Sequence, residues 1–213
     1  MNRITKRLIL YILGLFLLAL GATFSIRASL GVSPVTSLPY ALALITPFSV
    51  GITTVFANAV FIVIQALLLK EIRWKNFFLQ FIISFVFGAF MDIAVWLTSF
   101  LPSATNMIFI LVYFILSLFV VAFALILYFT AELPMMPYDA LTYVISNQFK
   151  MPFGKAKITS DSINVLISLL LCLIFIHAFG SIGIGTFIAA YAIGKILGLL
   201  LPKVQPHLKT WLN

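Results

Sequence analysis

Acidic side chains inside apolar segments are the residues of this 213-residue chain that could carry out chemistry. Asp92 lies within a long apolar run, and Asp139 closely follows Pro137 at the start of a short one. A charged side chain in hydrocarbon costs about 3 kcal/mol, so it requires a partner or a water-filled cavity. Asp92 is therefore a candidate proton or cation site, or else a hydrogen-bonded acid between helices. Asp139 is a second candidate, although capping of free backbone N–H groups would also explain its place in a first helical turn.

Amide and hydroxyl side chains form two stripes at helical spacing. Asn58 shares a helical face with Thr54 and Gln65, and a second face holds Asp161, Asn164, Ser168 and Cys172. Such stripes would line a common aqueous pathway, or they would hydrogen-bond across helix contacts. The spacing alone leaves both interpretations open.

Four further polar residues lie close to the expected helix ends. Arg27 precedes the Gly31–Pro34 turn, where it would anchor at the outer membrane interface or face an anion near the next helix start. Ser33 and Thr36 flank Pro34 and would frame a site there. Asp161, which follows a Thr-Ser pair, is expected to cap a helix rather than to bind a ligand.

Enzyme, metal and cofactor signatures are scarce. The sequence has one Cys and two His, which are well separated, so neither a zinc site nor an internal disulfide is expected. HExxH, GxSxG and glycine-rich phosphate loops are absent from it. Tyr138-Asp139 matches the Tyr-Asp pair of intramembrane aspartyl proteases, but Asp92 precedes this pair and lacks the Gly-x-Gly-Asp context. We therefore expect no enzyme, no resident metal and no cofactor.

Composition points to a lipid environment. Hydrophobic residues make up 63% of the chain and charged residues 8%, compared with about 25% charged in soluble domains. The mean hydropathy is +1.21. We expect an all-α polytopic membrane protein in contact with a lipid bilayer, and its net charge of +8 does not imply nucleic-acid binding.

Apolar runs predict six transmembrane helices. These runs cover residues 8–26, 53–69, 77–101, 107–130, 158–177 and 182–201. Two shorter runs, 34–45 and 137–149, give about 20 Å of helix against a hydrocarbon core of about 30 Å. Both begin with Pro, which suits a first helical position. We interpret them as re-entrant half-helices.

The distribution of Lys and Arg favours this topology. With six spans, all of the 13 basic residues except Arg27 and Lys195 fall in cytoplasmic segments or at their edges. Eight full spans would move the Lys70–Lys75 cluster outside. We expect an inner-membrane protein with both termini in the cytoplasm and a first span that is retained.

Internal similarity predicts two inverted repeats in a single membrane domain. The first would cover residues 1–103, the second 104–202, and a cytoplasmic interfacial tail 203–213. Each half has the order span, half-helix, span, span, and three full spans per half require opposite orientations in the membrane. The aligned positions are Pro34, Leu38, Tyr40 and Asn58 in the first half and Pro137, Leu141, Tyr143 and Asn164 in the second.

Several motifs resemble those of the YczE/YitT-like bacterial integral membrane proteins. They are the Leu30-Gly31-Val32-Ser33-Pro34 turn, the Pro137-Tyr138-Asp139 turn, the Phe90-Met91-Asp92 acid and the Ile182-Gly183-Ile184-Gly185-Thr186 run. The resemblance spans nearly the whole chain and implies a bacterial inner-membrane location. Ser33 and Thr36 replace a Gly and an Asp of that family's first turn, so only Asp92 and Asp139 carry over as acids.

These observations favour a small-molecule transporter or exporter. Its site would lie at the midplane between the two opposed half-helices, and Asp92, Asp139, Asn58 and Asn164 would line the route. The alternative is an accessory or scaffold protein that binds a membrane partner or a second copy of itself through small-residue faces such as Ala190, Gly194 and Gly198. The substrate itself is not readable from the sequence.

Overall fold

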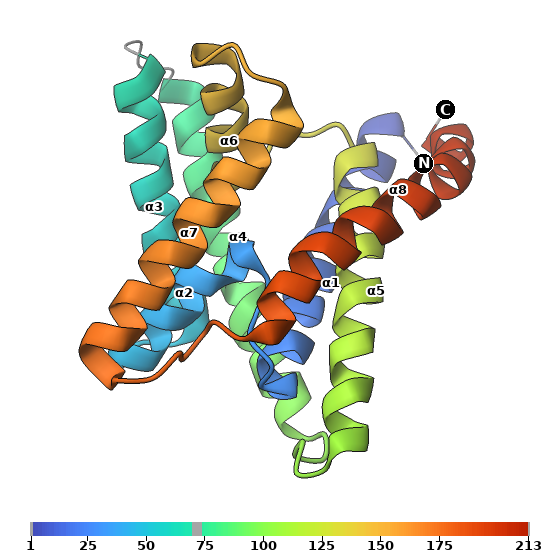
Figure 1. The fold of residues 1–213 in the computed structure, drawn as a ribbon. Coiled ribbons are helices and arrows are strands. Elements are labelled where there is room, and N and C mark those ends of the chain that lie inside the picture. The colour runs from blue at the N-terminus through green and yellow to red at the C-terminus, as the bar shows by residue number, and fades with distance from the viewer. Residues whose placement is uncertain (1, 70–73, 213) are drawn as a thin grey trace. The chain divides into compact units, whose positions relative to one another are not determined.

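The protein is all helical in the part of the chain that the structure describes. The computed structural model describes residues 2–69 and 74–212, and Figure 1 shows its eight helices over these residues. Six are long and apolar enough to cross a membrane, and two contain 12 residues each. This confirms the predicted fold class. The helices are α1 (Arg3–Ala28), α2 (Pro34–Ile45), α3 (Val50–Leu69), α4 (Trp74–Ser99), α5 (Met107–Thr130), α6 (Pro137–Gln148), α7 (Phe153–Ile176) and α8 (Ile184–Leu212).

Helix bounds follow local capping where the chain supplies it. α5 begins as predicted, because the Asn106 side chain accepts a hydrogen bond from Phe109 N at 3.0 Å. α7 begins earlier than its apolar run does, since Pro152 at its N-cap starts the helix within a polar segment. α8 continues through Pro202 and Pro206 to Leu212, so the segment predicted as an interfacial tail is helical.

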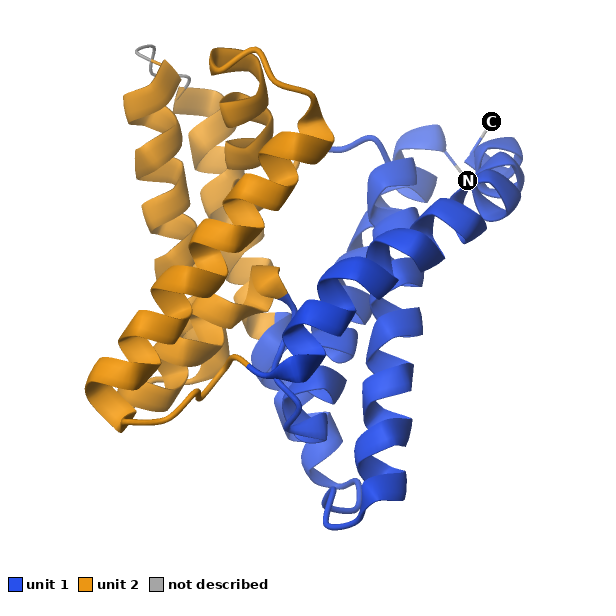
Figure 2. Ribbon diagram, in the orientation of Figure 1, with its two compact units in different colours: residues 1–33, 90–133, 183–213 blue, residues 34–89, 134–182 orange. Residues whose placement is uncertain are grey.

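The chain divides into two compact units (Figure 2). Unit 1 contains residues 1–33, 90–133 and 183–213, and unit 2 contains residues 34–89 and 134–182. α4 contributes its first part to unit 2 and its second part to unit 1. Each unit therefore draws helices from both halves of the sequence. Lys70 and Arg73 of the expected basic cluster lie outside the described residues.

Unit 1 is built on close contact between α1 and α5. Gly14 lies against the backbone of α5, where a Cβ atom would approach Tyr128 N to 2.8 Å. Tyr11 and Tyr128 add a ring contact with centroids 5.5 Å apart. Small residues allow such an approach, and dispersion forces then stabilise the pair in a solvent as apolar as the side chains themselves.

The turn after α1 packs on the start of α8 within the same unit. Leu30 O accepts a hydrogen bond from Gly185 N at 2.7 Å. Gly31 has a φ of 98°, and a Cβ there would lie 2.3 Å from Gly183 N. Only glycine fits a backbone with this dihedral and this clearance. The Gly31 turn and the Gly183-Ile184-Gly185 run are thus two sides of one backbone contact.

Polar groups join the ends of three chain segments in unit 1. Arg7 forms an ion pair with Glu132 and donates to Ala131 O at 3.0 Å. Lys6 Nζ donates to Trp211 O at 2.6 Å. The start of α1 and the end of α8 therefore lie together.

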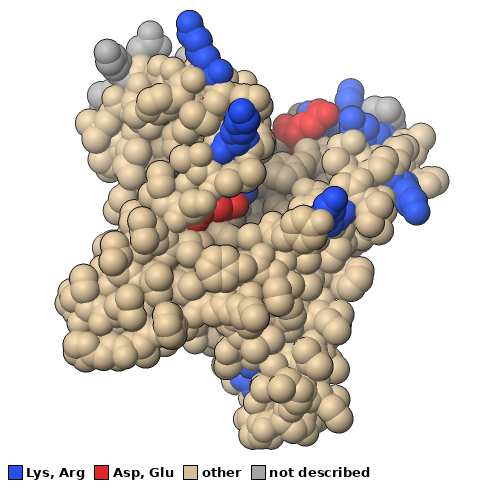
Figure 3. All heavy atoms as spheres, in the orientation of Figure 1, with Lys and Arg blue, Asp and Glu red and all other residues tan. Residues whose placement is uncertain are grey.

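Unit 2 packs α2 against α7 and α3 against α6. Along α7 the buried residues recur at every fourth position, whereas Ile163 is 51% exposed and Leu166 is 56% exposed. On the face shown in Figure 3, most of the surface is uncharged. One narrow polar face turned inward and wide apolar faces turned outward are typical of helices in lipid. The buried positions of α7 are Ala156, Ser160, Asn164, Ser168 and Cys172.

Substitution of Gly14 tests the α1–α5 contact. Gly14→Ala should lower the stability of the protein by about 1–3 kcal/mol, because its Cβ would overlap the α5 backbone. Gly194→Ala is the matched control, since nothing lies within 4 Å of its Cβ position; it should gain up to about 1 kcal/mol from helix propensity. Thermal unfolding in detergent measures both. Equal shifts in the unfolding temperature of the two variants would contradict the close contact between α1 and α5.

Candidate functional site

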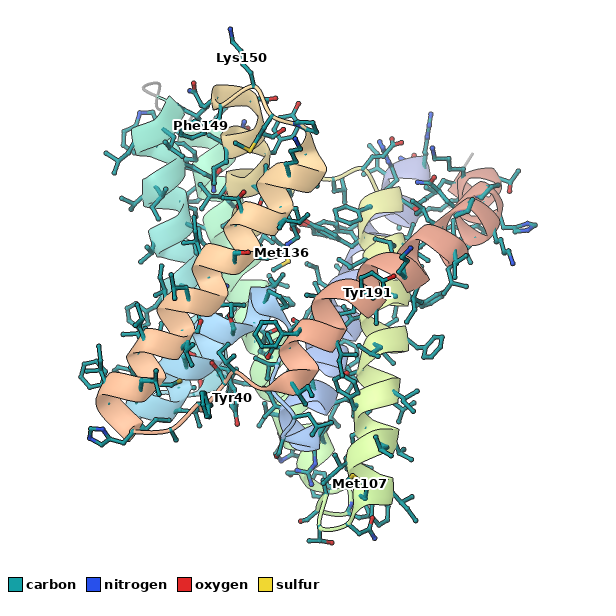
Figure 4. The ribbon with its side chains drawn as sticks, in the orientation of Figure 1. Tyr40, Met107, Met136, Phe149, Lys150 and Tyr191 are labelled. Atoms are coloured by element: carbon teal, nitrogen blue, oxygen red, sulfur yellow. The ribbon has the colours of Figure 1, made fainter. Side chains whose placement is uncertain are left out.

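The starts of the two short helices lie inside unit 2. Pro34 and Thr36 of α2 and Pro137 and Asp139 of α6 are all buried. Met136, which precedes α6 and is labelled in Figure 4, is 3% exposed. Proline suits a first helical position because the N–H that it lacks would have no partner inside the helix. Both short helices thus begin within protein, where few other groups can satisfy their ends.

The two short helices run toward opposite ends of α3 (Figure 1). α2 ends at Ile45, close in sequence to the first residue of α3, Val50. At the other end, the Gln148 side chain in the last turn of α6 donates to Leu68 O at 2.8 Å. Lys150, just beyond α6, projects away from unit 2 (Figure 4). This is the opposed arrangement that the sequence predicts for two half-helices.

A side-chain amide from a long helix binds the first carbonyl of each short helix. Asn164 Nδ2 on α7 donates to Pro34 O at 2.6 Å, and Gln65 Nε2 on α3 donates to Pro137 O at 3.0 Å. Gln65 is also paired with Gln80 of α4 at 3.0 Å. The arrangement is reciprocal, since each amide comes from one half of the sequence and its carbonyl from the other. We call these contacts the two amide clamps.

One apolar cluster joins the two helix starts. Tyr138 and Leu141 of α6 pack with Phe61 of α3, and the Phe61 and Tyr138 rings lie 5.2 Å apart. Val35 and Leu38, from the first turns of α2, pack against the same cluster. The beginnings of α2 and α6 are therefore neighbours in unit 2.

A charged cluster lies where α6 meets α7. Lys157 Nζ is 3.0 Å from Asp161 Oδ1 and 4.0 Å from Asp139 Oδ1. It also lies 4.3 Å from the centre of the Tyr138 ring, and the Tyr138 hydroxyl donates to Asp161. We call these four side chains the Lys157 cluster. One ammonium thus contacts two carboxylates and an aromatic face.

The polar groups of the predicted stripes are hydrogen-bonded in some positions and unpaired in others. Asn164 and Ser168 hydrogen-bond across a helix contact, since Ser168 Oγ donates to Ser37 Oγ at 3.0 Å. Asn58 is 4% exposed and its Nδ2 has no hydrogen-bond partner in the described structure. Ser160 Oγ is likewise buried without a partner. The stripes therefore serve partly as packing contacts, and two polar groups stay unsatisfied.

Other predicted residues lie as follows. Thr36 is 8% exposed in the first turn of α2, and Ser33 immediately precedes that helix. Asp92 is half-buried on the part of α4 that belongs to unit 1. Arg27, also in unit 1, donates to Leu101 O at 2.7 Å. Thr36, Asn58, Asn164 and Asp139 belong to unit 2.

The expectation that Asp161 caps a helix is wrong. This residue lies well inside α7, where it pairs with Lys157 one turn earlier and accepts from Tyr138. The sequence prediction missed the role of Lys157. Its i, i+4 spacing to Asp161 is a signal that could have revealed the pair.

The fold defines an integral membrane protein with six helices that are long and apolar enough to span a membrane and two short ones. The chain belongs to a family of unknown function (DUF6198), whose family model matches residues 5–202. It is 25% identical over 197 residues to the uncharacterized protein YyaS of Bacillus subtilis (strain 168), covering 92% of this chain and 93% of that one. These matches show this family and not specifically the YczE/YitT-like proteins. No solved structure matches the chain.

The amide clamps predict unequal effects for two similar substitutions. Asn164→Ala removes a hydrogen bond to Pro34 O, whereas Asn58→Ala removes an amide N–H group that has no partner. The Asn164 variant should lose about 1 kcal/mol more stability than the Asn58 variant, since their exposures of 3% and 4% are matched. Thermal unfolding of the purified variants measures the difference. Equal losses would show that the clamp contributes nothing.

Proposed function

We propose that this protein is a small-molecule transporter or exporter whose binding site lies in unit 2, at the starts of α2 and α6. The main support is the pair of opposed short helices that begin inside the protein. Inverted repeats with broken helices near the midplane are a recurrent architecture of secondary transporters, in which helix starts and unpaired backbone groups bind the substrate.

Unsatisfied buried polar groups support the same proposal. Asn58 Nδ2 and Ser160 Oγ have no partner in the described structure, although buried polar groups in native proteins are almost always paired. A bound polar molecule or water in the site would satisfy them. Asp139 supplies a carboxylate at the start of α6, so the site combines amide, hydroxyl and acidic groups.

The membrane orientation is part of this proposal. We place the protein in the bacterial cell membrane, with both termini in the cytoplasm. The contact between Lys6 and Trp211 supports this orientation, because it brings the two ends of the chain together. Lys6 and Arg7 at the start of α1 and Lys209 in the last turn of α8 then supply the positive charge that favours the cytoplasmic face.

A second candidate function is that of an accessory protein. Ala190, Gly194 and Gly198 form an exposed stripe on α8, and nothing lies within 4 Å of the Cβ positions of the two glycines. Small-residue stripes of this kind allow helices of different chains to approach closely. This function requires no water-filled route in unit 2, so measurement of water access separates the two candidates.

Thiol labelling in intact cells tests the transporter. In a Cys172→Ser background, cysteines at positions 58 and 164 should react with a membrane-impermeant thiol reagent despite their depth, because they line the proposed route. Phe56 and Ile163 are matched controls on the same helices, 56% and 51% exposed toward the expected lipid, and cysteines there should stay unreactive. Unreactive cysteines at all four positions would contradict the route and favour the accessory function.

A further inference from the structure

The Lys157 cluster has the composition of a binding site for an organic cation. Its three partners are two carboxylates and the face of a Tyr ring, and all of them surround a single ammonium group. Carboxylates and aromatic faces together are the groups that proteins use to bind alkylammonium ligands. In this structure the ammonium belongs to the protein itself.

An ordinary surface ion pair does not account for this arrangement. Exposed i, i+4 pairs on one helix contribute about 0.3–0.5 kcal/mol and require no third partner. Here Asp139 comes from a second helix, and its side chain is 12% exposed, compared with 22% for Asp161. The Lys157 side chain is 29% exposed, which is more than either carboxylate side chain.

The charges in the cluster restrict the ligand. Two carboxylates face one ammonium, so an anion would meet net negative charge. Replacement of the Lys157 ammonium by another monovalent ammonium leaves the local charge unchanged. The exchange therefore leaves no uncompensated charge in a medium of low dielectric constant. The ring face favours an organic cation over a metal ion, and the described residues include no group of three His, Cys, Asp or Glu that could hold a metal.

A buried hydroxyl without a partner in the described structure, that of Ser160, lies on the same turns of α7 as the cluster. Ser160 is 7% exposed and lies between Lys157 and Asp161 in the same turns of α7. Its Oγ has no partner in the described structure. A ligand that carries a polar group beside its ammonium would satisfy this hydroxyl.

We propose that the Lys157 cluster is the part of the transport site that binds a monovalent ammonium group of the substrate, which enters by displacing the Lys157 side chain. This inference rests on the proposed transport function and names its substrate class. Lys157 acts as a resident substitute that keeps the carboxylates neutralised when the site holds no substrate.

Binding of n-propylammonium to the purified full-length protein tests the inference. This cation reproduces the part of the Lys157 side chain that Lys157→Ala removes. Isothermal titration calorimetry at constant ionic strength should show saturable binding to the wild type and binding at least about tenfold tighter to Lys157→Ala, because a tethered competitor acts at an effective concentration in the millimolar range. Asp161→Asn should abolish binding.

Lys155→Ala is the matched control, because Lys155 is an exposed lysine on the same helix and its loss should leave the affinity of the wild type unchanged. Gel filtration verifies that each variant is folded and monodisperse. Absence of saturable binding to both the wild type and folded Lys157→Ala would overturn the inference, as would equal binding to Asp161→Asn. Thiol labelling at position 58 does not depend on Lys157. If position 58 is labelled but no ammonium binding is found, this inference fails while the proposed transport function stands.

Discussion

Backbone polar groups inside a membrane protein must find partners within the protein, because lipid offers none. A half-helix that starts inside the protein is the most demanding case, since the N–H groups of its first turn have no partner within the helix. The starts of α2 and α6 are both buried, and the amide clamps hold each of them by its first carbonyl, from Asn164 for α2 and from Gln65 for α6. These contacts join the polar stripes of α3 and α7 to the starts of the two short helices, where the candidate site lies.

Much of the fold could be predicted because hydropathy and proline placement are local signals. The run 107–130 and the short segment that begins at Pro34 coincide with α5 and α2. The ends of the helices were harder to predict from the sequence. α7 starts in a polar segment at Phe153, and α8 continues past two prolines, so composition marked neither of these bounds.

The site was only partly predictable, because its key contacts join residues far apart in sequence. The sequence located Asp139, Asn58 and Asn164 but left pathway and packing roles open for the amides. It assigned Asp161 to a cap, since its Thr-Ser context is typical of helix starts. The meeting of Lys157 with Asp139 depends on the packing of α6 against α7, which no local pattern contains.

The central claim is that α2 and α6 enter the membrane from opposite faces without crossing it, and sided labelling of the loops that follow them tests it most directly. Phe48, 49% exposed after α2, and Lys150, exposed after α6, would each be replaced by cysteine in the Cys172→Ser background. The account predicts that an impermeant thiol reagent labels position 48 in intact cells and position 150 only after permeabilisation. Labelling of both from the same side would mean that the short helices cross fully, and it would contradict the account.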